Sequence, residues 1–164
     1  MAHWLVKSDP ETYDYADLER DGRTEWDGVH NAAALIHLRK MRPGDGLLVY
    51  HSGSERAVVG LAEVASDPHP DPKDTRGSWS MMIRPVRRLR SPVTLADLRA
   101  DRALDGWVLF RMSRLSVMPV SDAQWTAVLA HEDGPRSAPV RAAPTGRGRA
   151  TSRRRRGTAA RRTR

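Results

Sequence analysis

The chain has 164 residues, no cysteine and a formal net charge of +8. This length suffices for one domain with a buried core and is short for two. The lack of cysteine excludes a disulfide framework and any cysteine-ligated metal site. The first residues contain no long apolar run of the kind found in signal peptides and membrane spans, so we expect a cytoplasmic protein, nucleoid-associated if the source is bacterial.

The basic charge is concentrated at the C-terminal end. Residues 135–164 contain 11 of the 28 Lys and Arg residues and none of the 20 Asp and Glu residues, which leaves residues 1–134 with 17 − 20 = −3. The same stretch has almost no large apolar side chain, so it cannot bury enough surface to offset its ordering entropy. We therefore predict a folded domain over residues 1–134 and a disordered Arg-rich tail over residues 135–164.

Strands and short helices alternate in the first half of the chain. The patterns predict a strand over His3–Lys7, a helix over Tyr15–Arg20, a loop over 24–31, a helix over 32–42, and a hairpin formed by Gly46–Ser52 and Ala57–Ala65. Asn31 is expected to cap the second helix, because its side-chain oxygen can accept from the first free backbone amides. The apolar face of that helix is expected to contain Leu35, Ile36, Leu38 and Met41. Gly60 is typical of a β-bulge.

The second half is predicted to be richer in strands. Its patterns indicate a stiff loop over Asp67–Pro72, a strand over Ser78–Leu89, a helix over Thr94–Arg99, strands over Gly106–Arg111 and Leu115–Val120, and a helix that begins after Ser121. Pro85 requires an edge or bulge position, because proline has no amide proton. Strands outnumber helices and hairpin links predominate. We therefore predict an α+β fold, a mixed, mostly antiparallel β-barrel with short helices around it.

Binding residues are easier to recognise in this sequence than catalytic ones. The six histidines are scattered and fit no metal-binding spacing, so we expect neither a metal nor another cofactor, and no catalytic residue. Flat aromatic rings beside hydrogen-bonding groups suit a pocket for a planar heterocycle. On the residues alone, two structural alternatives stay open: Trp26 as a core residue, and His51 as a strand-end histidine bonded to backbone.

A series of short motifs follows in a fixed order over about residues 3–130. They are Trp4–Pro10 (WLVKSDP), Trp26–Asn31 (WDGVHN), Leu38–Asp45, Tyr50–Ser52 (YHS), Val59–Val64, Pro70–Pro72, Trp79–Met81 and Leu115–Val120. In this order they resemble the pattern of the EVE domain, a family within the PUA-like superfamily. The resemblance implies a PUA-like barrel whose pocket accepts a modified nucleobase, with modified cytosine in DNA, such as 5-methylcytosine, as the expected ligand.

The resemblance also implies which residues bind. The pocket is expected to be lined or bordered by Lys7, Ser8, Trp26, Val29, Asn31, Tyr50, His51, Ser52 and Trp79. A paired base cannot stack on an indole, so we expect the base to leave the duplex. The DNA backbone is expected to contact His30 and the tail arginines Arg153, Arg154, Arg155 and Arg156. The chain departs from the family pattern at His30, where Arg is usual, and over Ala33–Ile36, where the family often has two amides.

The expected protein is a non-catalytic reader of modified DNA that acts as a monomer and away from membranes. Three alternatives stay open. One is an RNA-binding module linked to RNA modification. Another is an enzyme acting on a modified nucleotide, with His51 or Asp27 as general base. The third is a nucleoid-associated protein whose barrel is only a platform for other proteins.

Overall fold

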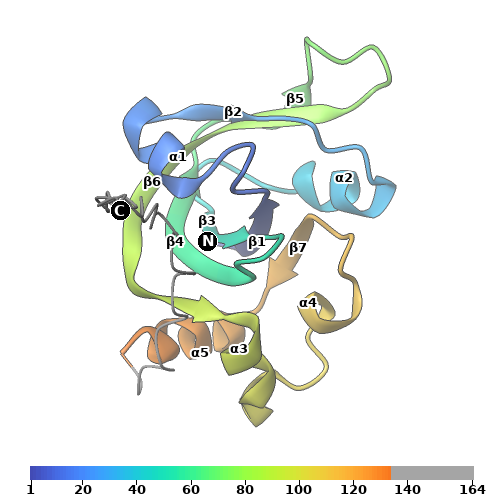
Figure 1. Ribbon diagram of the computed structural model, residues 1–164. Helices are drawn as coiled ribbons and strands as arrows, with labels where there is room; N and C mark the ends of the chain where they lie inside the picture. The colour runs from blue at the N-terminus through green and yellow to red at the C-terminus, as the bar shows by residue number, and fades with distance from the viewer. Residues whose placement is uncertain (134–164) are drawn as a thin grey trace, which may run out of the picture.

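A single curled sheet organises residues 1–133, the part of the chain that the computed structural model describes (Figure 1). Its strands are β1 His3–Ser8, β2 Thr24–Trp26, β3 Gly46–His51, β4 Ala57–Val64, β5 His69–Pro70, β6 Trp79–Thr94 and β7 Val117–Val120. The helices are α1 Tyr15–Asp21, α2 Ala32–Leu38, α3 Leu95–Ala100, α4 Val108–Arg111 and α5 Asp122–Glu132, with a 3₁₀ turn over Arg102–Leu104. The tail predicted over residues 135–164 lies outside the described residues.

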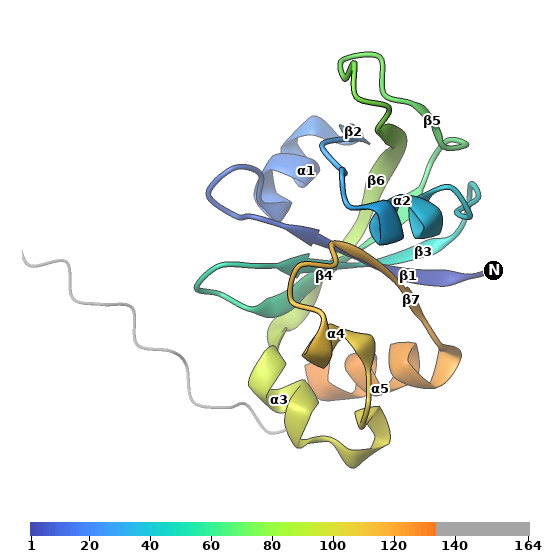
Figure 2. The same ribbon diagram turned by 90° about the vertical axis from the view of Figure 1, so that its right-hand side faces the viewer.

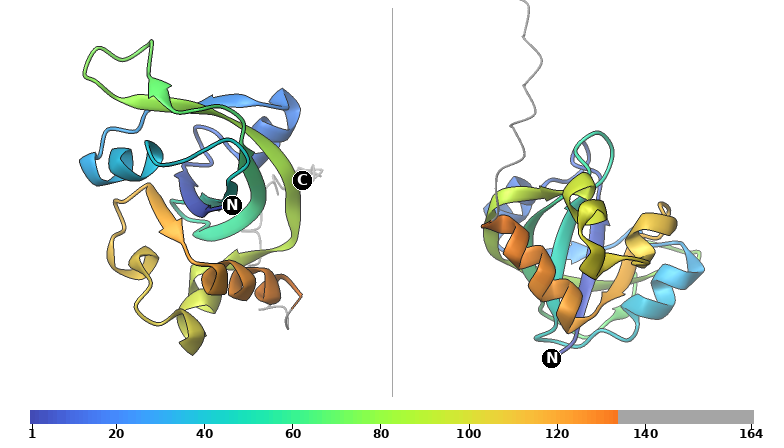
Figure 3. Two further views of the ribbon diagram at one scale, coloured as in Figure 1. Left: turned by 180° about the vertical axis from the view of Figure 1, so that it is seen from behind. Right: turned by 90° about the horizontal axis from the view of Figure 1, so that it is seen from below.

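The strands pair in the order β2-β6-β4-β3-β1-β7, and β5 pairs with β6. Only β1 and β3 are parallel among these pairs, so the sheet is mixed and mostly antiparallel, as predicted. The long strand β6 curls round one side of the molecule, from β2 to α3 and α5 (Figures 1 and 3). Within the described residues β2 and β7 do not pair with each other, which makes the sheet a half-barrel. No helix of residues 1–133 has the length and apolar character needed to cross a membrane.

Gly60 allows α1 to pack closely on the sheet. The register of β3 and β4 with their neighbours shifts at this point, which confirms the predicted bulge. A Cβ atom at Gly60 would clash with the ring of Tyr15, which lies across β4 in its place. The Tyr15 hydroxyl donates to the carbonyl of Leu61 at 2.6 Å. A strand that lacks one side chain thus accommodates the first residue of α1.

The helix starts follow the sequence closely. Asn31 accepts from the Ala34 amide at 3.1 Å and caps α2, as predicted. Capping boxes at Asp14, Thr94 and Ser121 begin α1, α3 and α5. These side chains satisfy backbone amides that have no partner inside the helix.

Several predicted elements were wrong. Residues 106–111 form no strand: Gly106 turns the chain at φ 78°, and 108–111 form α4 with Trp107 and Leu109 buried. Large apolar residues suggested a strand there, but tertiary packing selects a helical turn. Ile36 is 56% exposed and so does not belong to the buried face of α2.

Two segments predicted as loops contain strands. The stretch 24–31 begins with β2, whose residues pair with β6 from Ile83 to Met81. In the proline-rich segment His69 and Pro70 form β5, paired with Ser80 and Trp79. Neighbouring strand β6 supplies the backbone partners in both cases, and a local pattern cannot reveal such a partner.

Candidate functional site

A narrow crevice opens between β1, α1 and β2. It is lined by Ser8, Tyr13, Asp14, Tyr15, Leu18, Trp26 and Val49. The crevice holds about 150 Å³ of unfilled space, open to solvent, and none of it admits a water-sized sphere. Pockets for small molecules usually enclose about 300–1,000 Å³. A planar ring could therefore enter only if a wall side chain moved.

Trp26 belongs both to the core and to the crevice. It is the last residue of β2, pairs with Met81, and is 8% exposed. Its indole packs into the main hydrophobic cluster and also forms part of the crevice wall. Trp26 is therefore a core residue and a wall of the crevice at the same time.

The parallel pairing of β1 with β3 brings two of the sequence motifs together. Lys7 is level with Tyr50 and Ser8 with His51. Beyond the last pair, the amide and the hydroxyl of Ser52 both donate to the carbonyl of Ser8, at 2.9 and 3.2 Å. The Ser8 hydroxyl donates in turn to the carbonyl of Tyr13. This network fixes the strand ends beside the crevice.

His51 orients the start of α1. It is buried, and its Nε2 accepts from the Tyr15 amide at 3.1 Å, so the ring proton lies on Nδ1. Nδ1 lies 2.7 Å from Oε2 of Glu55 and donates to it. Both ring nitrogens are thus engaged. In this arrangement His51 positions a crevice wall and has no nitrogen free to bind a ligand.

Lys7 connects the crevice to the segment after α4. Its Nζ donates to the carbonyls of Ser113 at 3.0 Å and Met112 at 3.4 Å. The same ammonium lies 5.7 Å from the centre of the Tyr50 ring. Burial lowers the pKa of Lys7 from its ordinary value. The side chain is therefore held in place at the border of the crevice rather than free in solvent.

The remaining predicted pocket residues lie around the crevice or away from it. Asn31 is exposed, but its side-chain oxygen is occupied by the α2 cap, and Val29 is buried in the core. Trp79 is half-buried and is not among the crevice walls; the guanidinium of Arg39 lies 4.6 Å from its ring centre. The structure thus brings Ser8 and Trp26 into one crevice bordered by Lys7, Tyr50, His51 and Ser52.

His30 lies among charged groups from the segment before β6. Its Nδ1 is 3.4 Å from Oδ2 of Asp74, and its Nε2 is 3.2 Å from Nη2 of Arg76. A permanent guanidinium therefore stands beside the imidazole. The predicted backbone contacts Arg153, Arg154, Arg155 and Arg156 lie outside the described residues.

Five wall residues were not predicted from the sequence: Tyr13, Asp14, Tyr15, Leu18 and Val49. The available signal was the pair of tyrosines around the Asp14 cap, directly after the first motif. Most polar groups of the wall are already engaged, since Asp14 Oδ1 accepts from the Asp17 amide at 2.8 Å. The free surface of the crevice is therefore largely apolar and aromatic.

A serine, a histidine and a glutamate meet elsewhere, between β2, β5 and β6. His69 Nε2 lies 2.6 Å from Glu25 Oε1 and 3.3 Å from the Ser80 hydroxyl, and its Nδ1 donates to the carbonyl of Asp67 at 3.1 Å. A nucleophilic triad needs the serine and the acid on opposite ring nitrogens, whereas here both face Nε2. Residues 1–133 contain no group of His, Asp and Glu that could hold a metal.

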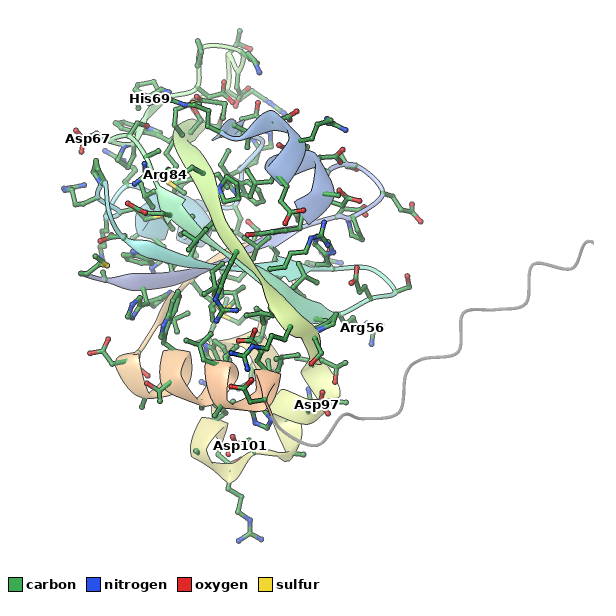
Figure 4. All side chains as sticks on the ribbon, turned by 90° about the vertical axis from the view of Figure 1, so that its left-hand side faces the viewer. Arg56, Asp67, His69, Arg84, Asp97 and Asp101 are labelled. Atoms are coloured by element: carbon green, nitrogen blue, oxygen red, sulfur yellow. The ribbon has the colours of Figure 1, made fainter. Side chains whose placement is uncertain are left out.

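A second cavity, with about 610 Å³ of unfilled space by the same measure, lies at the other end of the sheet. It is lined by Gly22, Arg23, Pro43, Gly44, Glu63, Val64, Ala65 and Arg84. Glu63 pairs with Gly46 at the start of β3, whereas His51, at the crevice, is the last residue of that strand. Figure 4 shows Arg84 near this end of the molecule and Arg56 at the β3–β4 hairpin. The two openings are thus separated by the length of the strands.

Comparison with known proteins gives consistent results. The family model described as the EVE domain matches residues 2–131. Thymocyte nuclear protein 1 of Homo sapiens is 31% identical over 167 residues, which cover 80% of this chain and 74% of that protein.

Solved structures share the fold. The NMR structure of Rpa0253 from Rhodopseudomonas palustris has 36% identity and a TM-score of 0.77, with 81% of this chain and 94% of that chain covered. A crystal structure of the human THYN1 protein in complex with 5-methylcytosine-containing DNA has 26% identity and a TM-score of 0.77, with 83% and 100% covered. The curled mixed sheet with short helices is the PUA-like fold of these proteins.

Proposed function

Because this chain belongs to the EVE-domain family, we propose that it binds DNA and holds one modified base, turned out of the duplex, in the crevice between Ser8 and Trp26. The observation that carries the proposal is that these two residues, from separate motifs on β1 and β2, line one crevice. A modified cytosine is the ligand to test, since the human THYN1 protein was solved with 5-methylcytosine-containing DNA. In this proposal the protein is a binding module rather than an enzyme.

The apolar walls favour a base that carries an extra methyl group. Stacking a base on an aromatic ring contributes about 1–3 kcal/mol, which offsets the few kcal/mol needed to extrude it. Burying one additional methyl against Leu18, Val49 or Trp26 stabilises by about 0.8 kcal/mol, or about a fourfold preference over plain cytosine. Because the polar groups of the crevice wall already have hydrogen-bond partners in the protein, few of them can bind the edge of the base.

Tyr13 is the wall residue that we expect to move when a base enters. Its side chain is half-buried, and its hydroxyl donates to the exposed carboxylate of Asp21 at 2.9 Å. Tyr15, by contrast, is buried and bonded to Leu61. Tyr13 packs on the outside of the core whereas Tyr15 lies within it, so an outward rotation of Tyr13 would widen the crevice at a smaller cost in core packing.

The test is equilibrium binding of the full-length chain to two duplexes that differ by a single 5-methylcytosine. We expect the modified duplex to bind about fourfold or more tightly. Trp26→Leu should remove this preference, whereas Trp26→Phe, which keeps a ring, should retain part of it. Trp125→Leu is the matched control, because Trp125 stacks on His3 at the other end of β1.

Equal affinity of the wild-type chain for the two duplexes would contradict the proposal. Single-stranded RNA that competes more strongly than modified DNA would favour the RNA-binding alternative. Loss of folding in Trp26→Leu, seen as the absence of a cooperative thermal transition, would leave Trp26→Phe to decide the role of the ring.

A further inference from the structure

The arginines of the described residues differ in how their charge is balanced. Those of β6 each pair with a carboxylate, as Arg84–Glu63, Arg87–Glu132, Arg88–Glu19 and Arg90–Asp133. Beside the crevice the partners are backbone carbonyls: Arg111 donates to Gly106 at 3.3 Å and Arg99 to Phe110 at 3.4 Å. Arg114 has no ion-pair partner within residues 1–133. Arg99, Arg111 and Arg114 thus form no ion pair within residues 1–133, unlike the arginines of β6.

The segment 111–114 lies beside β1, the strand whose last residue lines the crevice. Lys7 donates from its amide to the carbonyl of Ser116 at 2.9 Å and from its ammonium to that of Ser113 at 3.0 Å. The next residue of β1, Ser8, is a crevice wall. Figure 2 shows the chain between α4 and β7 passing beside the end of β1. Side chains alternate between the two faces of a strand, so this segment lies on the Lys7 face and the crevice on the Ser8 face, at the same end of β1. A duplex that binds across this strand end contacts both.

Met112 is an exposed apolar side chain on a fixed backbone. It is 47% exposed, between Arg111 and the polar pair Ser113 and Arg114. Its amide donates to the carbonyl of Val108 at 2.9 Å, and its own carbonyl accepts from Leu115 and Lys7. The main chain is thus held while the side chain points into solvent. Proteins that unstack DNA insert apolar side chains of this kind between bases.

The opposite side of the crevice is acidic. The segment from Asp9 to Asp21 contains Asp9, Glu11, Asp14, Asp17, Glu19 and Asp21, against a single Arg20. Residues 94–116, on the side of α3 and α4, contain four arginines against three aspartates, a net charge of 4 − 3 = +1. Phosphates are therefore repelled from the side of α1 and not from the side of α3 and α4. Tyr50 shows the same asymmetry: burial raises the pKa of its hydroxyl, and the positive charges of Arg56 and Arg99 oppose that rise. The charge distribution therefore favours one orientation of the duplex.

We propose that residues 111–114 form the segment that enters the DNA. Met112 fills the space that the extruded base leaves in the stack, and Arg111 and Arg114 bind the phosphates on either side. This inference rests on the proposed function, because a space in the stack exists only if a base is extruded. The phosphate contacts apply to plain duplex as well, and they can be measured separately.

The first experiment addresses Met112 in the full-length chain. The probe is a duplex with one 5-methylcytosine and a neighbouring 2-aminopurine, whose fluorescence rises when it loses stacking. Met112→Ala should weaken binding to this duplex on the order of tenfold and reduce the fluorescence rise, while Met112→Leu should preserve both. Val86→Ala is the matched control, because Val86 is 56% exposed on β6, where every arginine is paired.

The second experiment addresses the phosphate contacts on plain duplex. The double variant Arg111→Ala/Arg114→Ala should reduce the slope of log affinity against log salt by about two, one for each arginine that no longer neutralises a phosphate. The control Arg23→Ala/Arg84→Ala removes the same charge at the opposite end of the sheet and should leave the slope unchanged. Thermal unfolding of each variant confirms that it is folded.

The outcomes separate the two proposals. If the wild-type chain fails to prefer the modified duplex, the proposed function and the role of Met112 both fail, and the salt slope alone decides whether the segment contacts DNA. If the wild-type chain does prefer it and Met112→Ala behaves like Val86→Ala, the insertion of Met112 is overturned. A salt slope that is equal in the two double variants overturns the phosphate contacts.

Discussion

The space above Gly60 determines where a crevice wall lies. Tyr15 fills this space, bonds to Leu61 through its hydroxyl, and is held at its amide by His51. Burial raises the pKa of Tyr15 to about 12, so the hydroxyl remains a donor at any physiological pH. One missing side chain on β4 thus fixes an aromatic ring at the candidate site.

Gly60→Ala is therefore expected to affect both stability and binding. The new methyl group overlaps the Tyr15 ring, and such overpacking typically costs about 1–3 kcal/mol. Displacement of the ring should also weaken the preference for 5-methylcytosine, which thermal unfolding and duplex binding would measure side by side. Tyr15→Phe is the control: it loses only the bond to Leu61, costs about 1 kcal/mol, and keeps the wall. Equal stability of Gly60→Ala and wild type would show that the ring is not confined as described.

Secondary-structure elements were predictable where their signals are local. The caps at Asn31, Thr94 and Ser121 appear in the sequence because a cap involves residues only three apart. The prediction of a strand over 106–111 is wrong because its large apolar residues suit a strand locally, whereas tertiary packing buries Trp107 and Leu109 in a helical turn. Chain order alone carries no information about such partners.

The sequence indicates which motifs supply residues to the candidate site, but it does not indicate which of these residues meet in space. The parallel alignment of Ser8 with His51 depends on the β1–β3 register, which no periodicity reveals. Trp79 was grouped with Trp26 because both are aromatic and stand in motifs, yet the crevice excludes it. Tyr13 was missed because it belongs to no motif and reaches the crevice only through the turn before α1.

The attachment of β5 to the sheet is expected to depend on pH. The hydrogen bond to the Asp67 carbonyl raises the pKa of His69 above 6.5, with a further contribution from the Glu25 carboxylate. Because the pKa of His69 is higher in the folded chain than in the unfolded chain, its protonation stabilises the folded form at pH values below the unfolded-state pKa. This stabilisation is lost as the pH rises through the folded-state pKa. Amide exchange at Asp67 and His69, the two residues of 67–70 that carry an amide proton, should therefore accelerate beyond the intrinsic effect of pH as the pH rises above about 6.5.

His69→Gln serves as the control for this pH dependence. Glutamine can still hydrogen-bond to Glu25 but does not titrate, so exchange in β5 should show only the intrinsic effect of pH. Figure 4 shows His69 and Asp67 near the end of the molecule opposite Arg56, so the core strands should not respond. An unchanged pH profile in the variant would mean that His69 does not control the attachment of β5.

At the scale of the whole molecule, charge is divided between three regions. The α1 side of the crevice is acidic, the α4 side carries arginines without an ion pair, and residues 135–164 add 11 arginines without an acid. In the proposed function, most of the non-specific attraction to phosphate comes from residues 135–164, and recognition of a base comes from the crevice. They should respond differently to truncation and to salt.

Truncation after residue 133 tests this division. Removal of the arginine-rich segment should weaken binding to plain and modified duplexes by the same factor and flatten the salt dependence, because phosphate contacts do not depend on sequence. The ratio of the two affinities should be preserved. Titrations at two salt concentrations measure both quantities, and a truncated chain that keeps the full salt slope would place the phosphate contacts entirely within residues 1–133.

The position of β1 in the sheet has a consequence for biosynthesis. Strand β1, the first of residues 1–133, lies between β3 and β7, and β7 is the last strand of that described part. Folding must therefore wait until residues 117–120 have been translated, more than a hundred residues after His3, and such long-range closure is slow. Until then Lys7 lacks the carbonyls of Met112 and Ser113. The nascent chain therefore cannot complete the proposed DNA-facing side before nearly the whole domain has been synthesised.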